Sequence, residues 1–296
     1  MFTFAHVSDL HLPCDPHLTL RQHFSKRQLS VWSWRKRHAI QSAAVLDALR
    51  IELQQAAVDH VVVTGDLTNF ALPQEFAAAA AWLRTLAPPE RVSLVPGNHD
   101  ALVAVPARDG LDRWRAWTRL DEGGWPFVHD LGAVVLIGIS TAVPTLPLLA
   151  RGRVGIEQCA RLEQCLQRQA GRCRVVLMHH PPVDGIVSPR KALADRAAVR
   201  AVLARAGAEL VLYGHARDAH VDCVAGPRAP IPCLCVPSSS ALPNPHDEGA
   251  RWHQLTVAEQ GDGWTLEVRV RRWSVAAGAF ADGDPFTRGL PVNRAQ

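Results

Sequence analysis

Leu94-Val95-Pro96-Gly97-Asn98-His99-Asp100 is the most informative segment of the sequence. The apolar run over residues 92–95 predicts a short buried strand, and Gly-Asn is a common turn signal. A turn by itself does not require histidine and aspartate at the next two positions. We therefore expect residues 97–100 to carry chemistry at the point where a buried strand ends.

Four other predicted strands, at residues 2–7, 61–64, 174–178 and 210–213, are followed by residues of the same kind. These residues are Asp9 and His11, Gly65 and Asp66, His179 and His180, and Gly214 and His215. In an α/β sheet the strand ends on one edge converge, so these side chains are expected to share one crevice. Carboxylate, imidazole and amide oxygen together suit divalent cations, and the pattern predicts a metal site.

Short apolar runs alternate with helical patterns along the chain, which is typical of an α/β protein. Helices are predicted at residues 38–57, 73–86, 109–120, 155–170 and 192–206. Further strands are predicted at 127–129, 133–140, 220–224, 232–236, 252–257 and 265–270. Residues 276–296 show little periodicity and are expected to form a loose tail after a single domain that spans residues 1–275.

The composition excludes some classes of protein. The chain has 296 residues, 48% of them apolar, which is enough for a sizeable core. The longest apolar runs, such as residues 131–139, fall far short of the ~20 residues of a membrane-spanning helix. No secretory signal is visible, and seven irregularly spaced cysteines favour a cytoplasmic protein. A net charge of +4 is too small to favour nucleic acid as a partner.

The positive charge is concentrated in residues 21–38, which we interpret as a cap insertion. The segment holds six basic residues, no acidic residue, and the aromatic side chains Phe24, Trp32 and Trp34. One interpretation is a solvated helix. The other is a lip beside the crevice that contacts an anionic membrane surface or a lipid phosphate.

The ordered set Asp-x-His, Gly-Asp, Gly-Asn-His-Asp, a later His and Gly-His resembles the calcineurin-like metallophosphoesterases, over roughly residues 3–220. Residues 155–158, which open a predicted helix, look like the bacterial phosphodiesterase branch. The resemblance implies a four-layer α/β/β/α sandwich of two mixed sheets. It also implies a hydrolase of phosphodiester or pyrophosphate bonds that uses two divalent metal ions and a bridging hydroxide.

Carried onto this sequence, the resemblance assigns Asp9 and His11 to the first metal and Asp66 to both metals. It assigns the second metal to Asn98, His179 and His215. We prefer His179 to His180 as the ligand because it directly follows the strand, and we expect His180 either to contact substrate or to support the ligands from behind. Manganese or iron is expected, and zinc is also compatible with mixed nitrogen and oxygen ligation.

The resemblance further makes His99 the proton donor to the leaving group, with Asp100 orienting its ring. One position departs from the family pattern. Gly-His-x-His reads Gly214-His215-Ala216-Arg217 here, and arginine does not lose its proton to bind a cation. Two explanations remain open for Arg217: it binds the substrate phosphate, or it marks a lost ligand that His220 replaces.

The sequence leaves the substrate open between small-molecule and lipid-linked phosphates. UDP-2,3-diacylglucosamine, cyclic nucleotides and glycerophosphodiesters are all candidates, the first of them with the enzyme at the inner face of the membrane. A catalytically weakened binding or scaffold protein is the alternative from another class. Retention of His99 and Asp100 favours the enzyme, because a scaffold has no use for a proton donor beside the metals.

Overall fold

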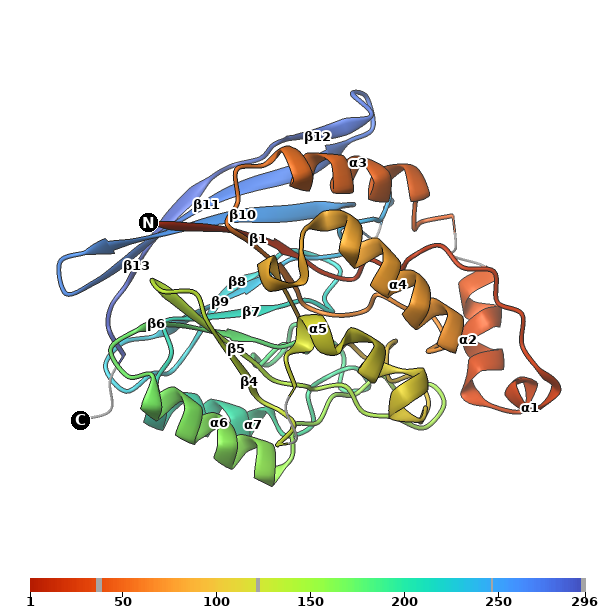
Figure 1. Ribbon diagram of the computed structural model, residues 1–296, viewed down its shortest axis with the longest axis horizontal. Coiled ribbons are helices and arrows are strands. Elements are labelled where there is room, and N and C mark those ends of the chain that lie inside the picture. The colour runs from red at the N-terminus through yellow and green to blue at the C-terminus, as the bar shows by residue number, and fades with distance from the viewer. Residues whose placement is uncertain (36–38, 121–122, 246, 294–296) are drawn as a thin grey trace.

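The computed structural model describes residues 1–35, 39–120, 123–245 and 247–293, and it contains two stacked β-sheets (Figure 1). The first sheet has the order β12-β11-β10-β1-β2-β3, with β13 also paired to β11. Its strands are β1 (Phe2–Val7), β2 (His60–Val63), β3 (Val92–Leu94), β10 (Arg251–Gln260), β11 (Gly263–Ser274), β12 (Ala279–Asp282) and β13 (Phe286–Leu290).

The second sheet has the order β4-β5-β6-β7-β9-β8. Its strands are β4 (Phe127–Asp130), β5 (Val134–Gly138), β6 (Cys173–Leu177), β7 (Leu210–Tyr213), β8 (Val221–Val224) and β9 (Ile231–Cys235). Both sheets combine parallel and antiparallel pairs. In the first, β1, β2 and β3 run parallel while β10 pairs antiparallel with β1; in the second, β5, β6, β7 and β9 run parallel.

Helices cover the outer face of each sheet, which confirms the predicted four-layer sandwich. The helices α3 (Ala43–Gln55) and α4 (Pro73–Leu86) pack on the first sheet, and α6 (Ile156–Arg168) and α7 (Arg196–Ala206) pack on the second. A third apolar cluster fills the space between the sheets, with Phe4, Leu136 and Leu255 fully buried there. No helix among the described residues is long and apolar enough to cross a membrane.

Residues 20–35 form two short helices, α1 (Leu20–His23) and α2 (Lys26–Arg35), at the end of the molecule opposite the N-terminus (Figure 1). Lys36 and Arg37 of the basic segment lie outside the described residues, as does residue 38, where a helix was predicted to begin. That helix, α3, begins at Ala43, because Ser42 is its N-cap and accepts the Val45 N–H at 3.4 Å.

The predicted helix at 109–120 is broken into short turns. They are the 3₁₀ turns η2 (Ala107–Asp109) and η3 (Leu111–Trp114) and the single-turn helix α5 (Arg115–Thr118), and one more 3₁₀ turn, η1 (Pro89–Arg91), precedes β3. Gly110 separates η2 from η3, and glycine lowers the stability of a continuous helix. The helix predicted to begin at 192 begins at Arg196 instead.

The prediction of a loose tail is wrong over residues 279–290. These residues form β12 and β13, which pair with two different parts of β11. Beyond them, the buried Asn293 receives a hydrogen bond at its backbone oxygen from Arg174 and donates its N–H to Glu209 at 3.0 Å, which ties the chain to the second sheet. Edge strands with one wet face carry a weak apolar pattern, so the sequence did not reveal them. Residues 294–296 lie outside the described part of the chain.

Candidate metal centre

Two groups of potential metal ligands lie side by side and share Asp66. His11, Asp66 and His99 form the first group, and Asp66, His179 and His215 form the second. Within each group the ligand atoms lie within 4.8 Å of one another. A carboxylate common to two adjacent groups is the arrangement that a bridged pair of cations requires, so the donor set fits the predicted dinuclear centre.

The backbone that carries these ligands is strained. Asp9, His11, Asp66 and His215 all have left-handed φ angles, between 42° and 67°. Such angles are uncommon outside glycine and concentrate at functional sites. The motif glycines have a related role, because a Cβ atom on Gly97 would overlap Asp66 Oδ1 and one on Gly65 (φ +101°) would lie 2.8 Å from His179 Nδ1.

Backbone carbonyls fix the tautomers of two histidines. His179 donates from Nδ1 to the Thr64 carbonyl at 2.7 Å, and His215 donates from Nε2 to the Lys191 carbonyl at 3.0 Å. A carbonyl only accepts, so in the neutral ring the lone pair stands on the other nitrogen. Hydrogen bonds of this kind orient histidine ligands toward a metal and raise their basicity.

Asp9 and Asn98 adjoin the two groups without belonging to them. Asp9 Oδ2 accepts hydrogen bonds from the Ser8 hydroxyl at 2.6 Å and from the His215 N–H at 3.0 Å, so both bonds use the same carboxylate oxygen. Asn98 Oδ1 lies 3.2 Å from His179 Nε2. Both residues line the same crevice as the two groups.

His99 is held at two points. Its N–H donates to Asp66 Oδ1 at 2.7 Å, and its ring nitrogen Nδ1 is bonded to the Asn69 carbonyl at 2.9 Å. The ring stacks edge-on against His11, with centroids 4.7 Å apart. Nε2 is therefore the ring nitrogen left for a substrate. The role of Asn69 could not be predicted from the sequence, because its contribution is a backbone carbonyl that any residue could supply.

The structure corrects the expected role of Asp100. Its carboxylate accepts the backbone N–H groups of Asp66, Leu67, Thr68 and Gly97, at 2.9 to 3.1 Å, while the His99 ring is held by the Asn69 carbonyl. Burial and the nearby Asp66 charge raise the pKa of Asp100 to about 7. Asp100 thus joins the Gly-Asp loop to the Gly-Asn-His-Asp loop and acts on His99 only through the backbone.

Of the two roles expected for His180, the geometry favours support of the ligands over contact with substrate. The side chain is fully buried, with Nδ1 2.7 Å from the Thr141 hydroxyl and Nε2 3.1 Å from the Ala150 carbonyl. Both ring nitrogens are therefore engaged by the protein. The ring packs against His215 with centroids 4.4 Å apart, so His180 supports a ligand instead of meeting the substrate.

The charges of the centre are strongly coupled. Burial lowers the pKa of His179, but the Asp66 carboxylate beside it outweighs that effect and raises it to about 9. Burial opposes ionisation of Asp66 too, yet the neighbouring histidines, His179 first, hold its pKa well below the ordinary value. Burial lowers the pKa of His11 to about 4. The centre therefore pairs an ionised Asp66 with a protonated His179, so a cation that binds there would take the place of the His179 proton.

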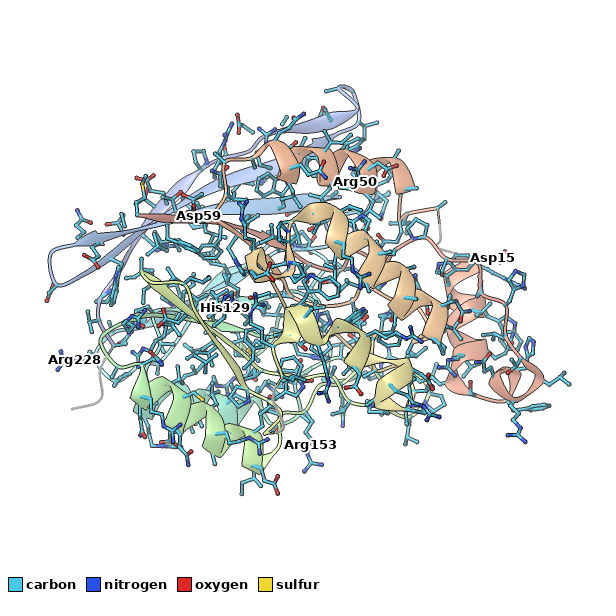
Figure 2. The ribbon with its side chains drawn as sticks, viewed as in Figure 1. Asp15, Arg50, Asp59, His129, Arg153 and Arg228 are labelled. Atoms are coloured by element: carbon cyan, nitrogen blue, oxygen red, sulfur yellow. The ribbon has the colours of Figure 1, made fainter. Side chains whose placement is uncertain are left out.

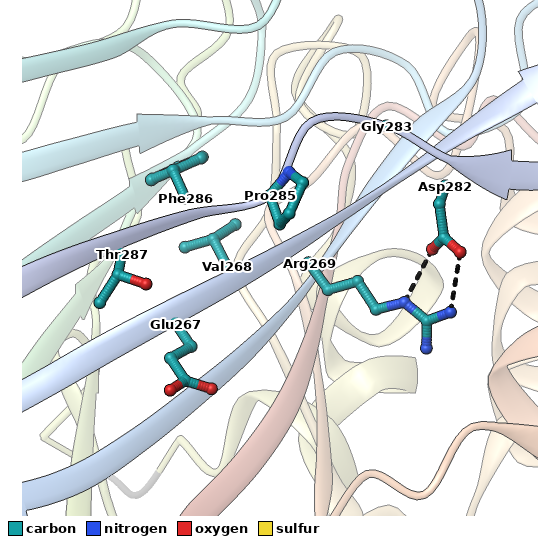
Figure 3. A pocket seen from close by; sticks show the side chains of 8 residues that line it. All are labelled: Glu267, Val268, Arg269, Asp282, Gly283, Pro285, Phe286 and Thr287. Atoms are coloured by element: carbon teal, nitrogen blue, oxygen red, sulfur yellow. Dashed lines mark hydrogen bonds and ion pairs between the residues drawn. The ribbon is translucent and has the colours of Figure 1, made fainter.

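All the proposed ligands except the fully buried His179 line a crevice of about 620 Å³ that also reaches α2. Its wall contains apolar side chains and cations, namely Leu29, Trp34, Ile40, Leu102, Leu148, Leu149, Lys26, Arg190, Lys191 and Arg217. A second hollow, about 510 Å³, lies over β11 between β12 and β13 (Figure 3). It is lined by the Arg269–Asp282 ion pair and has no lining residue in common with the crevice among the residues that the structure describes.

Comparison with known protein families identifies the family to which this chain belongs. The family model described as calcineurin-like phosphoesterase matches residues 2–216, well over half of the chain. The chain belongs to the calcineurin-like phosphoesterase family. As a member of that family it is a metallophosphoesterase, a metal-dependent hydrolase of phosphoesters. No curated protein sequence matches it.

Solved structures share the phosphoesterase fold at low sequence identity. A dimetal phosphatase from Danio rerio superposes with a TM-score of 0.61 at 13% identity, over 98% of this chain and 99% of that one. GAP50, described as the anchor in the inner membrane complex of Plasmodium, has a TM-score of 0.53 at 11% identity, over 100% of this chain and 90% of that one. At these identities the likeness concerns the fold alone.

This phosphoesterase differs from the family pattern at Arg217, which the structure places on the crevice wall. The side chain is half exposed, and its Nε lies 3.8 Å from Asp247 Oδ1. His220, the alternative ligand, is in neither of the ligand groups formed by the described residues, and it does not line the crevice. Its backbone carbonyl instead accepts the Cys235 N–H at 2.9 Å.

Proposed function

We propose that this phosphoesterase hydrolyses phosphodiester or pyrophosphate bonds, with His99 as the proton donor to the leaving group. The observation that carries the proposal is Asp66, which belongs to two adjacent ligand groups while its Oδ1 accepts the N–H of His99. The proton donor is thereby fixed at the carboxylate common to both groups. This position suits a residue that protonates the leaving group of a phosphate held between the two ligand groups.

Different side chains would hold the two metals and transfer the proton. We assign the first metal to Asp9 and His11, the second to Asn98, His179 and His215, and both to Asp66. When bound, two such cations neutralise the phosphate charge and lower the pKa of a water that attacks phosphorus. His99 gives a proton from Nε2 to the departing oxygen, while the Asn69 carbonyl keeps Nδ1 protonated. Manganese or iron remains the expected metal.

The crevice wall supports an amphiphilic substrate. Lys26, Arg190, Lys191 and Arg217 offer positive charge, and Leu29, Trp34, Leu148 and Leu149 offer apolar surface in the same crevice. A lipid-linked phosphate, of which UDP-2,3-diacylglucosamine is one candidate, presents both kinds of group. This substrate class places the enzyme in the cytoplasm at the inner face of the membrane. Small phosphodiesters reach the same ligands and serve as probes.

The test is hydrolysis of bis-p-nitrophenyl phosphate with added manganese, together with metal analysis of the purified protein. Asp66→Ala should lose metal from both positions and abolish turnover. His99→Ala should retain its metal and lose roughly 10²–10⁴-fold in kcat for a glycerophosphodiester, whose alkoxide leaving group needs a proton, with a smaller loss for bis-p-nitrophenyl phosphate. Exhaustive chelation should stop the wild-type enzyme.

His17→Ala is the matched control, because His17 is an exposed histidine that pairs only with the exposed Asp15. It should turn over like the wild type. Turnover that survives chelation would show that the reaction needs no metal. Equal metal loss in His99→Ala and Asp66→Ala would show that His99 is not the proton donor.

A binding or scaffold role is the second candidate. The departure at Arg217 favours it, because an arginine stands where the family pattern has a first-metal ligand, and the fold alone also occurs in an anchor protein. A protein of this kind would release no p-nitrophenol under any metal. The same assay therefore decides between the two candidates.

A further inference from the structure

Exposed apolar side chains are concentrated on two segments of the chain, each of which supplies one of them to the crevice lining. Among the described residues, half of the strongly exposed large apolar side chains lie on α1, α2 and the loop 146–148. We call this set the apolar rim; its members are Leu20, Phe24, Leu29, Trp32, Leu146 and Leu148. Phe24 is 93% exposed and Leu148 is 77% exposed. Contiguous apolar surface of this kind marks an interaction site.

The two parts of the rim are joined directly. Lys26 of α2 donates from Nζ to the Thr145 hydroxyl at 2.6 Å and to the Leu149 carbonyl at 2.8 Å. This bridge spans the base of the 146–148 loop. Leu148 has a left-handed φ of +66°, which is rare for leucine and is maintained here with the side chain in solvent. The loop is thus a fixed projection beside α2.

The rim is continuous with the inside of the crevice. Leu29 and Leu148 belong to both, and Trp34 and Leu149 are further apolar residues of the crevice lining. The rim and the crevice therefore share apolar surface that could contact an acyl chain.

The charge around the rim is positive. Arg21 and Arg35 are exposed on α1 and α2, and Arg190 is exposed on the crevice wall. The sequence has no acidic residue in 16–46, 131–156 or 185–194, the three segments that supply the rim and these cations. Asp15, at the same end of the molecule (Figure 2), is paired with His17 at 3.0 Å.

We propose that the apolar rim inserts into the interfacial region of an anionic phospholipid bilayer, so that the crevice opens toward the membrane. The inference rests on the proposed amphiphilic substrate and names where that substrate comes from. Leucine, phenylalanine and tryptophan on short projecting elements supply the apolar contact, and the surrounding arginines supply attraction to anionic headgroups. A protein partner would need acidic groups to match the same arginines.

The test is flotation with vesicles of mixed phosphatidylglycerol and phosphatidylcholine. The wild type should float with these vesicles, and less with phosphatidylcholine alone or at high salt, because exposed charges are screened. The double variant Phe24→Ser/Leu146→Ser, one change in each part of the rim, should lower partitioning at least about tenfold. Neither residue lines the crevice, so turnover of bis-p-nitrophenyl phosphate should be unchanged.

Val275→Ser is the control, since Val275 is 66% exposed in the turn between β11 and β12 and should not affect flotation. Equal flotation of the wild type and the double variant, or no flotation of the wild type, would overturn the inference. A wild-type dimer in light scattering that the double variant dissolves would also overturn it in favour of a contact between copies. Wild-type flotation without phosphodiesterase turnover would instead count against the proposed function alone.

Discussion

Arg217 is the residue at which the chain departs most clearly from its family. The guanidinium cannot be a cation ligand, but its donors suit a phosphate in a bidentate contact. It lines the crevice, and its pairing with Asp247 at 3.8 Å is loose enough for a substrate anion to replace. A first metal with fewer protein ligands would leave part of the phosphate charge for this arginine to neutralise.

We therefore predict that Arg217→Ala raises KM or lowers kcat for bis-p-nitrophenyl phosphate by about tenfold, the value of one charged hydrogen bond, while metal content holds. Arg217→His should bind the first metal more tightly without a gain in rate. Metal titration and steady-state kinetics on both variants make the measurement. If Arg217→His improves both metal retention and rate and Arg217→Ala is silent, the arginine is a lost ligand.

At the residue scale, the sequence predicted the candidate metal ligands but not the hydrogen bonds of the residues packed behind them. Asp66, His179 and His215 could be predicted because each follows a strand with a ligand side chain. The role of Asp100 could not, because its partners are backbone amides from loops whose paths the sequence does not specify. Hydrogen bonds to the main chain leave no mark on the residue type of the partner.

The loop 69–72, between β2 and α4, shows how elements support the centre. Glu75 accepts the N–H groups of Asn69, Phe70 and Leu72 at 2.7 to 3.0 Å, and Arg27 of α2 donates to the carbonyls of Phe70 at 2.9 Å and Ala71 at 2.6 Å. Asn69 in turn holds Nδ1 of His99. The carboxylate of Glu75 and the guanidinium of Arg27 thus fix the loop whose Asn69 carbonyl orients the proton donor.

We predict that Glu75→Gln lowers the free energy of unfolding by roughly 2 kcal/mol, because a buried amide loses its acceptor. It should also lower kcat by about tenfold with metal content intact, and the loss should be smaller for substrates with good leaving groups. A purely structural role would not produce that dependence on the leaving group. Glu157→Gln, an exposed first-turn acid of α6, is the control for both measurements.

The elements themselves were predictable in proportion to their apolar pattern. Strands β1, β2, β6 and β7 are mostly buried and rich in apolar residues, so their ends and the site at those ends could be predicted from the sequence. The short helix α5 and the edge strands β12 and β13 bury few residues and were misread. The only sequence signal for Glu75 is its place at the third position of α4, from which an acid can accept the N–H of the N-cap residue, here Leu72.

At the scale of the whole molecule, neutral histidines are packed inside the sandwich. His6 lies in β1 with Nε2 2.9 Å from the Thr64 hydroxyl, and His60 lies in β2 with Nε2 2.9 Å from the Ser93 hydroxyl. Both side chains are almost fully buried. Burial lowers the pKa of each to about 3, and for His60 the neighbouring His129 adds to the effect.

These histidines should make the fold sensitive to acid. In the unfolded chain a histidine takes up a proton below about pH 6.5, whereas His6 and His60 stay neutral in the folded state until pH approaches 3. The unfolded state therefore binds more protons in this window, and the free energy of unfolding falls as pH falls. Each group should lower the free energy of unfolding by about 2 kcal/mol between pH 7 and pH 5.

Urea unfolding at the two pH values makes the measurement. His60→Gln is expected to remove about that much of the difference, and the exposed His17→Gln is expected to remove none. Comparing variants with the wild type cancels the loss of metal in acid, so an unchanged pH difference in His60→Gln would show that this histidine is not held neutral by the fold.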